Sequence, residues 1–226
     1  MATAYRGRLI TLEGGEGAGK STAVATIEEW LRDRGRTTIL TREPGGTPPA
    51  EKIRGLLLDP DTGHLDPLTE LLLMFAARSE NLRQIIRPAI ERGDDVICDR
   101  FTDASMAYQG YGRQLGPEPV RTLQSVVHPD LQPDLTLLLD VPVTLGLNRI
   151  GERAGQPDRF ERSDGDFLER VRQGYLDQAK ASPERYAVID ASQSPDQVFE
   201  QVLSAANPLL QEVSPCVGVK LSGTTQ

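Results

Sequence analysis

The sequence is poor in the residues that stapled, metal-rich and membrane-spanning proteins need. Its 226 residues include two cysteines, two histidines and one tryptophan, and aromatic residues make up 5%. Cys98 and Cys216 lie far apart and match no metal-ligand spacing, so we expect neither a disulfide framework nor a zinc site. No apolar run is long enough to span a bilayer, and the first residues lack the apolar region of a secretion signal. We therefore expect a cytoplasmic protein with no membrane partner.

Positive charge is also in short supply. The chain has 33 Asp and Glu residues against 25 Lys and Arg, which gives a formal net charge of −8. An acidic chain disfavours non-specific binding to nucleic acid, so we expect no nucleic-acid partner. The length and the 38% apolar share suffice for one large domain that buries roughly 70% of its unfolded surface.

Short apolar runs alternate with longer helical patterns along most of the chain. We predict strands near Leu9–Leu12, Thr37–Leu40, Asp95–Cys98, Thr136–Leu139 and Ala187–Ile189. We predict helices over Ser21–Arg34, Pro49–Leu58, Pro67–Arg92, Asp103–Tyr108, Pro117–Val127, Val143–Arg153, Asp166–Ala181 and Pro195–Leu209. This alternation indicates an α/β fold, a three-layer sandwich with a mostly parallel five-stranded sheet and helices on both faces. We assign residues 1–210 to this domain and residues 211–226 to a loosely attached or disordered tail.

The stretch between the first strand and the first helix is rich in glycine. It consists of Gly14, Gly15, Glu16, Gly17, Ala18, Gly19, Lys20 and Ser21, which fits the phosphate-binding pattern G-x-x-x-x-G-K-[ST]. Glycines let successive backbone N–H groups turn toward phosphate oxygens, and the helix start adds its positive dipole end. Lys20 can reach the β- and γ-phosphates, and the Ser21 hydroxyl can bind Mg²⁺. The pattern predicts a nucleotide-binding fold of the P-loop NTPase type, with a glycine-rich turn that binds nothing as the alternative.

Two further polar clusters follow the third predicted strand. Such positions lie at the carboxyl edge of a parallel sheet, where ligands bind. Asp99 could face Mg²⁺ and its waters, although an aspartate that simply ends a strand is the alternative. The planar fork of Arg100 suits a phosphate. Ser105, Tyr108 and Gln109 fall on one side of a helix, where they could hold a sugar and a base edge.

A glycine-containing loop, Thr41–Thr47, follows the second predicted strand. Within it, Glu43 could accept a hydrogen bond from a hydroxyl group. An ordinary turn is an equally good interpretation of this loop.

An arginine-rich segment broken by glycine and proline spans residues 149–162. Its arginines are Arg149, Arg153, Arg159 and Arg162. A segment of this kind between two helices is typical of a mobile lid. Because phosphoryl transfer spreads negative charge over oxygens and the glycine-rich loop has no arginine, a lid arginine could stabilise that charge. The alternative is a solvated basic face whose arginines pair with Glu152, Asp158 and Glu161.

Several motifs stand in a characteristic order along the chain. They are Gly14–Ser21, Thr41–Thr47, Asp99-Arg100-Phe101, Ala107-Tyr108-Gln109-Gly110, Pro133-Asp134-Leu135 and Leu139-Asp140-Val141-Pro142. Over roughly residues 8–205 the chain thereby resembles the bacterial thymidylate kinases, in the subtype that keeps its catalytic arginine in the lid. The resemblance implies transfer of the ATP γ-phosphate to dTMP, giving dTDP, with Mg²⁺ as a further cofactor and a homodimer as the assembly.

The resemblance also implies roles around the phosphates. Lys20, Arg100 and Glu16 would be catalytic, with Arg100 holding the acceptor phosphate and Arg54 assisting it. Glu16 and Asp99 would lie near Mg²⁺ and the acceptor phosphate.

The catalytic lid arginine is implied to be Arg153, because Arg153–Arg159 is similar to the lid core of the family. This segment is one residue longer than expected, so Arg149 and Arg159 remain candidates.

At the other end of the acceptor, the resemblance places Glu43 near the sugar 3′-hydroxyl and Tyr108 against the sugar. Arg78, Ser105 and Gln109 would address the thymine edge.

The chain departs from the family at the position expected to stack on the base. The family has Phe-x-x-x-Arg, whereas here Met74 lies four residues before Arg78 and Phe75 follows it. Either Phe75 or Met74 could contact the base, or both could be plain helix core. The surrounding segment Glu70–Ala77 is apolar around the whole helix, which predicts burial, in part against a second subunit.

Three other functions compete with this interpretation. The first is another nucleotide kinase of the same fold with a different acceptor. The second is a GTP-dependent switch, but its Asn-Lys-x-Asp motif is absent from the sequence. The third is a nucleic-acid-dependent ATPase, which the acidic charge disfavours.

Overall fold

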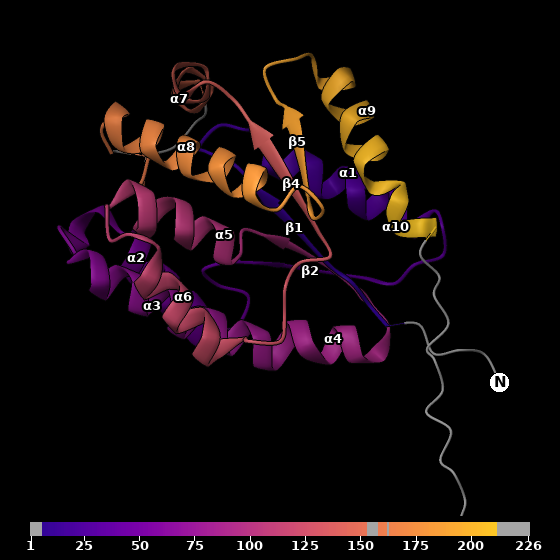
Figure 1. Cartoon of the computed structure of the whole chain (residues 1–226), viewed down its shortest axis with the longest axis horizontal. Helices are drawn as coiled ribbons and strands as arrows, with labels where there is room; N and C mark the ends of the chain where they lie inside the picture. Colours follow the sequence, from indigo (N-terminus) through magenta and orange to yellow (C-terminus); the bar gives the residue numbers. More distant parts are fainter. Residues whose placement is uncertain (1–5, 153–157, 162, 212–226) are drawn as a thin grey trace, which may run out of the picture.

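A parallel sheet of five strands forms the centre of the computed structural model, which describes residues 6–152, 158–161 and 163–211 (Figure 1). The strands are β1 (Leu9–Glu13), β2 (Thr38–Arg42), β3 (Asp95–Asp99), β4 (Leu135–Asp140) and β5 (Tyr186–Asp190). Their spatial order is β2-β3-β1-β4-β5, and each neighbouring pair is parallel. Register pairs Leu12 of β1 with Asp99 of β3, so the ends of these strands meet at one edge. The predicted strands and fold class are confirmed.

Helices connect the strands. They are α1 (Lys20–Arg32), α2 (Pro48–Leu58), α3 (Pro67–Asn81), α4 (Arg87–Arg92), α5 (Thr102–Ser105), α6 (Pro117–Val127), α7 (Val143–Gly151), α8 (Gly165–Ala181), α9 (Pro195–Ala206) and α10 (Pro208–Gln211). Shorter elements are the 3₁₀ turn η1 (Pro60–Thr62) and the π-helical segments η2 (Leu82–Ile86) and η3 (Met106–Gly112). In the described part of the chain, no helix is both long and apolar enough to cross a membrane.

Successive residues of the strands enter different cores, because side chains alternate across a sheet. Ile10 packs with Ile27 and Trp30 of α1 and with residues of α9, which lies beside α1 in Figure 1. Leu9 instead packs with Ile86 and Ile90 on the opposite face. These two cores give the predicted three layers.

The long helix predicted over Pro67–Arg92 forms as α3, η2 and α4 in succession. Pro88 lies at the start of α4, and its missing N–H removes one α-helical hydrogen bond, which accounts for the wider π-helical turn before it. The burial predicted for Glu70–Ala77 holds on one side of α3 within this chain, and burial against a second subunit stays a prediction. Leu72 is 49% exposed within this chain, and Glu70 is fully buried in ion pairs.

Two predicted segments fall partly outside the described residues. The lid predicted over residues 149–162 is described at 149–152 and 158–161, and residues 153–157 and 162 lie outside the described residues. The tail at residues 211–226 is described only at Gln211, where α10 ends.

Candidate functional site

The glycine-rich loop runs from the end of β1 to the start of α1. Gly14 and Gly17 have φ angles of 138° and 70°, in the range that favours glycine. A Cβ atom on Gly14 would lie 2.4 Å from the Leu139 carbonyl oxygen, and one on Gly17 would lie 2.1 Å from that of Gly146. These contacts show why the loop needs glycine here, because it packs directly against the backbone near the end of strand β4 and of helix α7.

Lys20 is the first residue of α1 and turns back over the loop. Its ammonium group donates to the carbonyl oxygens of Gly14 at 3.2 Å and Gly15 at 2.9 Å. Burial, followed by the nearby charge of Arg100, lowers the pKa of Lys20. The ammonium group is thus held at the centre of the loop, where the phosphate-binding pattern predicts it.

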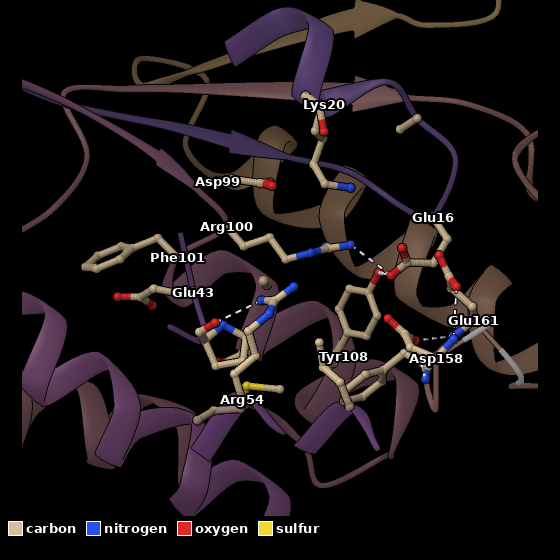
Figure 2. Close-up of a pocket in the computed structure, with 18 of the residues that line it drawn as sticks. Glu16, Lys20, Glu43, Arg54, Asp99, Arg100, Phe101, Tyr108, Asp158 and Glu161 are labelled. Carbon is tan, nitrogen blue, oxygen red and sulfur yellow. Dashed lines mark hydrogen bonds and ion pairs between the residues drawn. The ribbon is translucent and has the colours of Figure 1, made fainter. Parts of the chain in front are cut away.

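One cavity of about 550 Å³ adjoins this loop and brings most of the predicted site together. Figure 2 shows Lys20, Asp99 and Arg100 at one end of it, with Glu43 and Arg54 beyond Arg100. Its predicted lining residues are Glu16, Gly17, Ala18, Gly19, Lys20, Ser21, Glu43, Arg54, Met74, Arg78, Asp99, Arg100, Ser105, Tyr108 and Gln109. Arg149, Phe101, Asp158, Phe160 and Glu161 also line it. Gly14 and Gly15 instead line a smaller neighbouring cavity.

Arg100 crosses the cavity toward the loop. Its φ angle of 69° is unusual for a residue with a side chain, and its N–H donates to the Leu12 carbonyl oxygen at 3.0 Å. The guanidinium donates to the Gly14 carbonyl oxygen at 3.0 Å and to Glu16 Oε1 at 2.8 Å. Tyr108 donates its hydroxyl to the same Glu16 oxygen at 2.6 Å (Figure 2). Arg100 and Glu16 therefore form an ion pair at the end of the cavity next to the glycine-rich loop.

Asp99 offers the features of a metal ligand beside this pair. Its Oδ1 atom is buried and has no hydrogen-bond partner, and its side chain shares the cavity lining with Ser21 and Lys20. Among the described residues, no cluster of three His, Cys, Asp or Glu side chains could hold a metal. One carboxylate and one hydroxyl suit Mg²⁺, which keeps several waters and binds substrate phosphates. The residues present therefore fit this ion.

The opposite end of the cavity is built on a buried ion pair. Arg78 Nε donates to Glu43 Oε2 at 2.6 Å, and Arg78 Nη2 donates to Ser105 Oγ at 3.1 Å. Asn81 donates to the other Glu43 oxygen at 3.4 Å. Burial raises the pKa of Glu43, and the charge of Arg78 opposes that rise. The Arg78 Nη1 atom is buried and has no partner, which leaves one donor for a ligand.

Gln109 contributes a complementary group at the same end. Its Nε2 atom donates to Glu70 Oε1 at 2.8 Å, whereas its Oε1 atom is buried without a partner. Two residues that line the cavity thus carry unpaired polar atoms, a donor on Arg78 and an acceptor on Gln109. This is the pattern of a site that recognises a polar edge.

Met74 and Phe75 occupy different places. Met74 lines the cavity, whereas Phe75 is 2% exposed and is absent from its lining. The Phe75 ring lies 4.4 Å from Arg78 Cζ and stacks at 6.3 Å on His128. In this structure Phe75 supports Arg78 from outside the cavity, and only Met74 is in a position to contact a ligand.

Two arginines of the predicted lid segment donate hydrogen bonds to backbone carbonyl oxygens. Arg149 donates to the Ala191 carbonyl oxygen at 3.0 Å, and Arg159 donates to that of Leu57 at 2.7 Å. Arg159 also forms an ion pair with Glu70 at 2.7 Å and is 10% exposed, so a solvated basic face does not describe it. Arg153 lies outside the described residues.

Glu13 and Tyr175 belong to the site, although the sequence analysis did not select them. Glu13 is fully buried at the end of β1 and accepts from the Phe101 N–H at 2.7 Å and the Tyr175 hydroxyl at 2.8 Å. Tyr175 also accepts from Arg100 at 3.1 Å. Burial, followed by the charge of Asp103, raises the pKa of Glu13 to about 8. A carboxylate inside an apolar strand could have indicated Glu13, whereas nothing local indicates Tyr175.

Comparisons with known proteins identify the family of this chain. A sequence model of the thymidylate kinase family matches residues 12–202. The thymidylate kinase of Alkalilimnicola ehrlichii is 52% identical over 219 residues, covering 97% of this chain and 98% of that protein. That of Chromohalobacter salexigens is 57% identical over 189 residues, covering 83% and 89%. The crystal structure of thymidylate kinase from Ehrlichia chaffeensis superimposes with a TM-score of 0.73 at 35% identity, covering 91% of this chain and 99% of that one. The chain belongs to the thymidylate kinase family.

Proposed function

We propose that the cavity binds dTMP as the phosphoryl acceptor and that ATP with Mg²⁺ is the donor. As a thymidylate kinase, the protein phosphorylates dTMP to dTDP. The observation that carries the assignment of the site is that one cavity is lined by Lys20 and Arg100 and also by Arg78 and Gln109, which carry unpaired polar atoms. A nucleoside monophosphate has the same layout, with a dianion at one end and a polar base edge at the other.

The glycine-rich loop and its neighbours hold the donor. Backbone N–H groups of Gly14–Ser21 and the Lys20 ammonium bind the phosphates, while Ser21 and Asp99 hold Mg²⁺ directly or through water. Mg²⁺ supplies neutralisation of the charge that develops on the transferred phosphoryl oxygens.

The acceptor phosphate takes the place of Glu16 on Arg100. A phosphate dianion is a stronger partner for guanidinium than the carboxylate it displaces, and Arg54, also in the cavity lining, adds a second guanidinium. No strong base is needed, because the second pKa of a phosphate monoester is about 6 and the nucleophile is already anionic. Positioning and the electrostatics of these groups supply most of the rate.

The base lies between Met74 and the polar atoms of Arg78 and Gln109. Arg78 Nη1 donates to a ring carbonyl and Gln109 Oε1 accepts from the neighbouring ring N–H, as thymine requires. Tyr108 lies against the sugar. The contact of Glu43 with the sugar 3′-hydroxyl stays a prediction, since its carboxylate is bound by Arg78 and Asn81.

Arg153 is our choice for the arginine that stabilises the transferred phosphoryl group. Arg153→Ala should lower kcat far more than the affinity for dTMP, measured by initial rates and by equilibrium binding of dTMP. An increase in KM alone would remove this role. Arg149 and Arg159, which are bound to backbone carbonyls, serve as comparison variants. A homodimer and a cytoplasmic location also stay predictions.

A coupled assay with dTMP, dUMP, dCMP and AMP as acceptors, and with ATP or GTP as donor, tests the proposal. We expect dTMP with ATP to give the highest kcat/KM. Turnover of dCMP or AMP equal to that of dTMP would favour another nucleotide kinase. GTP hydrolysis without an acceptor would favour a switch protein.

A further inference from the structure

A buried carboxylate lies directly behind the base end of the cavity. Glu70, in the first turn of α3, is fully buried and is absent from the cavity lining. Its Oε1 atom accepts from Gln109 at 2.8 Å and from Arg113 Nε at 3.3 Å. Its Oε2 atom accepts from Arg113 Nη2 at 3.3 Å and forms an ion pair with Arg159 at 2.7 Å. Two guanidinium groups thus contact one carboxylate.

This carboxylate fixes the orientation of the Gln109 amide. An ionised carboxylate only accepts hydrogen bonds, so the Gln109 NH₂ group must face it and the carbonyl oxygen must point elsewhere. That oxygen is the buried Oε1 atom without a partner, on a side chain that is 1% exposed and lines the cavity. The Gln109 side chain, which lines the cavity, therefore carries its unpaired acceptor on the side away from Glu70, and the opposite orientation would place two acceptors against each other.

We propose that Glu70 is a positioning residue that sets base selectivity by holding the Gln109 amide with its acceptor toward the base. The inference rests on the proposed placement of the base between Arg78 and Gln109. A pyrimidine with a ring N–H beside a carbonyl, as in thymine or uracil, satisfies both free atoms. Cytosine presents a bare ring nitrogen and an amino group, which mismatches both. Glu70 thereby contributes to the rejection of dCMP but not to the distinction between dTMP and dUMP.

The Glu70→Gln variant should reverse the amide. Arg113 and Arg159 both contact the Oε2 position, whereas of these two only Arg113 contacts Oε1, so the single carbonyl oxygen of the new side chain is favoured at Oε2. Its NH₂ group then faces Gln109, whose carbonyl oxygen turns to accept from it. Gln109 would consequently present a donor to the cavity, which opposes a ring N–H and matches the bare ring nitrogen of cytosine.

The experiment compares kcat/KM for dTMP, dUMP and dCMP in the wild type, Glu70→Gln and a control, Glu118→Gln. Glu118 is 80% exposed and pairs only with Arg121 on the surface of α6 among the described residues. In Glu70→Gln we expect the dTMP/dCMP ratio to fall roughly 10- to 100-fold, the size of effect that one reversed buried hydrogen bond produces. The dTMP/dUMP ratio should stay within about twofold, because both bases present the same edge. Equal losses for all three acceptors would overturn the proposal.

A measurement on the wild-type protein covers the case in which Glu70→Gln does not fold. The Gln109 side-chain amide protons, assigned by their loss in Gln109→Leu, should be protected from solvent exchange before any ligand is added. Protection that develops only when dTMP binds would show that the amide faces the base and would overturn the proposal. A wild type that does not prefer dTMP would refute the proposed function instead, so the two failures are distinguishable.

Discussion

We call the end of the cavity near Lys20 and Arg100 the phosphate end and the end near Arg78 and Gln109 the base end, after the ligand groups proposed to bind there. The two ends hold their arginines in different ways. At the phosphate end, Arg100 pairs with Glu16, and these side chains are 17% and 16% exposed. At the base end, Arg78 pairs with Glu43, and the corresponding values are 2% and 3%. Arg100 contacts a loop carboxylate that a phosphate can replace, whereas Arg78 is enclosed by aromatic rings, Ser105 and Glu43.

The difference matches the chemistry of the two ligand groups. A phosphate dianion carries enough charge to displace a carboxylate from a guanidinium, so the phosphate end can be internally paired before binding. A neutral base cannot displace an ion pair, so its partners must be fixed in advance and must carry polar atoms that the protein itself leaves unpaired. The base end should therefore be part of the folding core, and the phosphate end should contribute chiefly to the rate.

The largest effect expected from this comparison is on stability at the base end. Arg78→Ala leaves Glu43 buried without its cation, which should cost about 3–5 kcal/mol in free energy of unfolding. Urea unfolding measures this cost. Arg42→Ala, which breaks the exposed pair with Glu51, is the control and should cost less than about 1 kcal/mol. Similar costs for the two variants would show that the base end is not a rigid part of the core.

Next in size is a rate effect at the phosphate end. Lys20→Ala removes the ammonium group from the loop and should lower kcat about 10²- to 10³-fold, as loss of one preorganised donor does. Its unfolding midpoint in urea should stay close to that of the wild type, because the freed carbonyl oxygens adjoin a cavity that water can enter. A large fall in that midpoint would place Lys20 in the core with Arg78.

Glu13 is fully buried although it lies next to the more exposed phosphate end, and its raised pKa predicts that the free energy of unfolding depends on pH. Its pKa is raised from 4.5 to about 8, so between these pH values the folded state keeps a proton that the unfolded state has lost. The contribution to stability is therefore complete below pH 4.5 and is lost as the pH rises through about 8. Glu13→Gln cannot ionise, so the stability difference between wild type and variant should change by up to about 1.4 kcal/mol per pH unit in this window.

Urea unfolding of both proteins between pH 5 and pH 8.5 measures this dependence. A difference that is constant with pH would contradict the raised pKa of Glu13.

Sequence reasoning identified the parts of the site that are local in the chain. The loop Gly14–Ser21 could be predicted because its spacing alone determines a backbone cradle and the position of Lys20. Glu70 could not, because its partners Arg113 and Arg159 come from distant segments that meet only when the helices pack. The same reason hid Tyr175, which reaches Arg100 from α8. The parallel sheet was predictable from the alternation of strands and helices, whereas the π-helical turns were not.

The smallest expected effects are on the KM for dTMP and on stability, and they distinguish Met74 from Phe75, its neighbour in α3. Met74 lines the cavity, so Met74→Leu should raise the KM for dTMP about 2- to 10-fold through loss of a sulfur–aromatic contact, with kcat nearly unchanged. Phe75 packs on Arg78 and His128 outside the cavity, so Phe75→Leu should cost about 1 kcal/mol of stability and leave that KM unchanged. Initial-rate kinetics give the KM for dTMP of each variant, and urea unfolding gives the free energy of unfolding of each. The reverse result, a KM effect from Phe75→Leu and none from Met74→Leu, would move the base to the other side of Arg78 and would remove Met74 from the site.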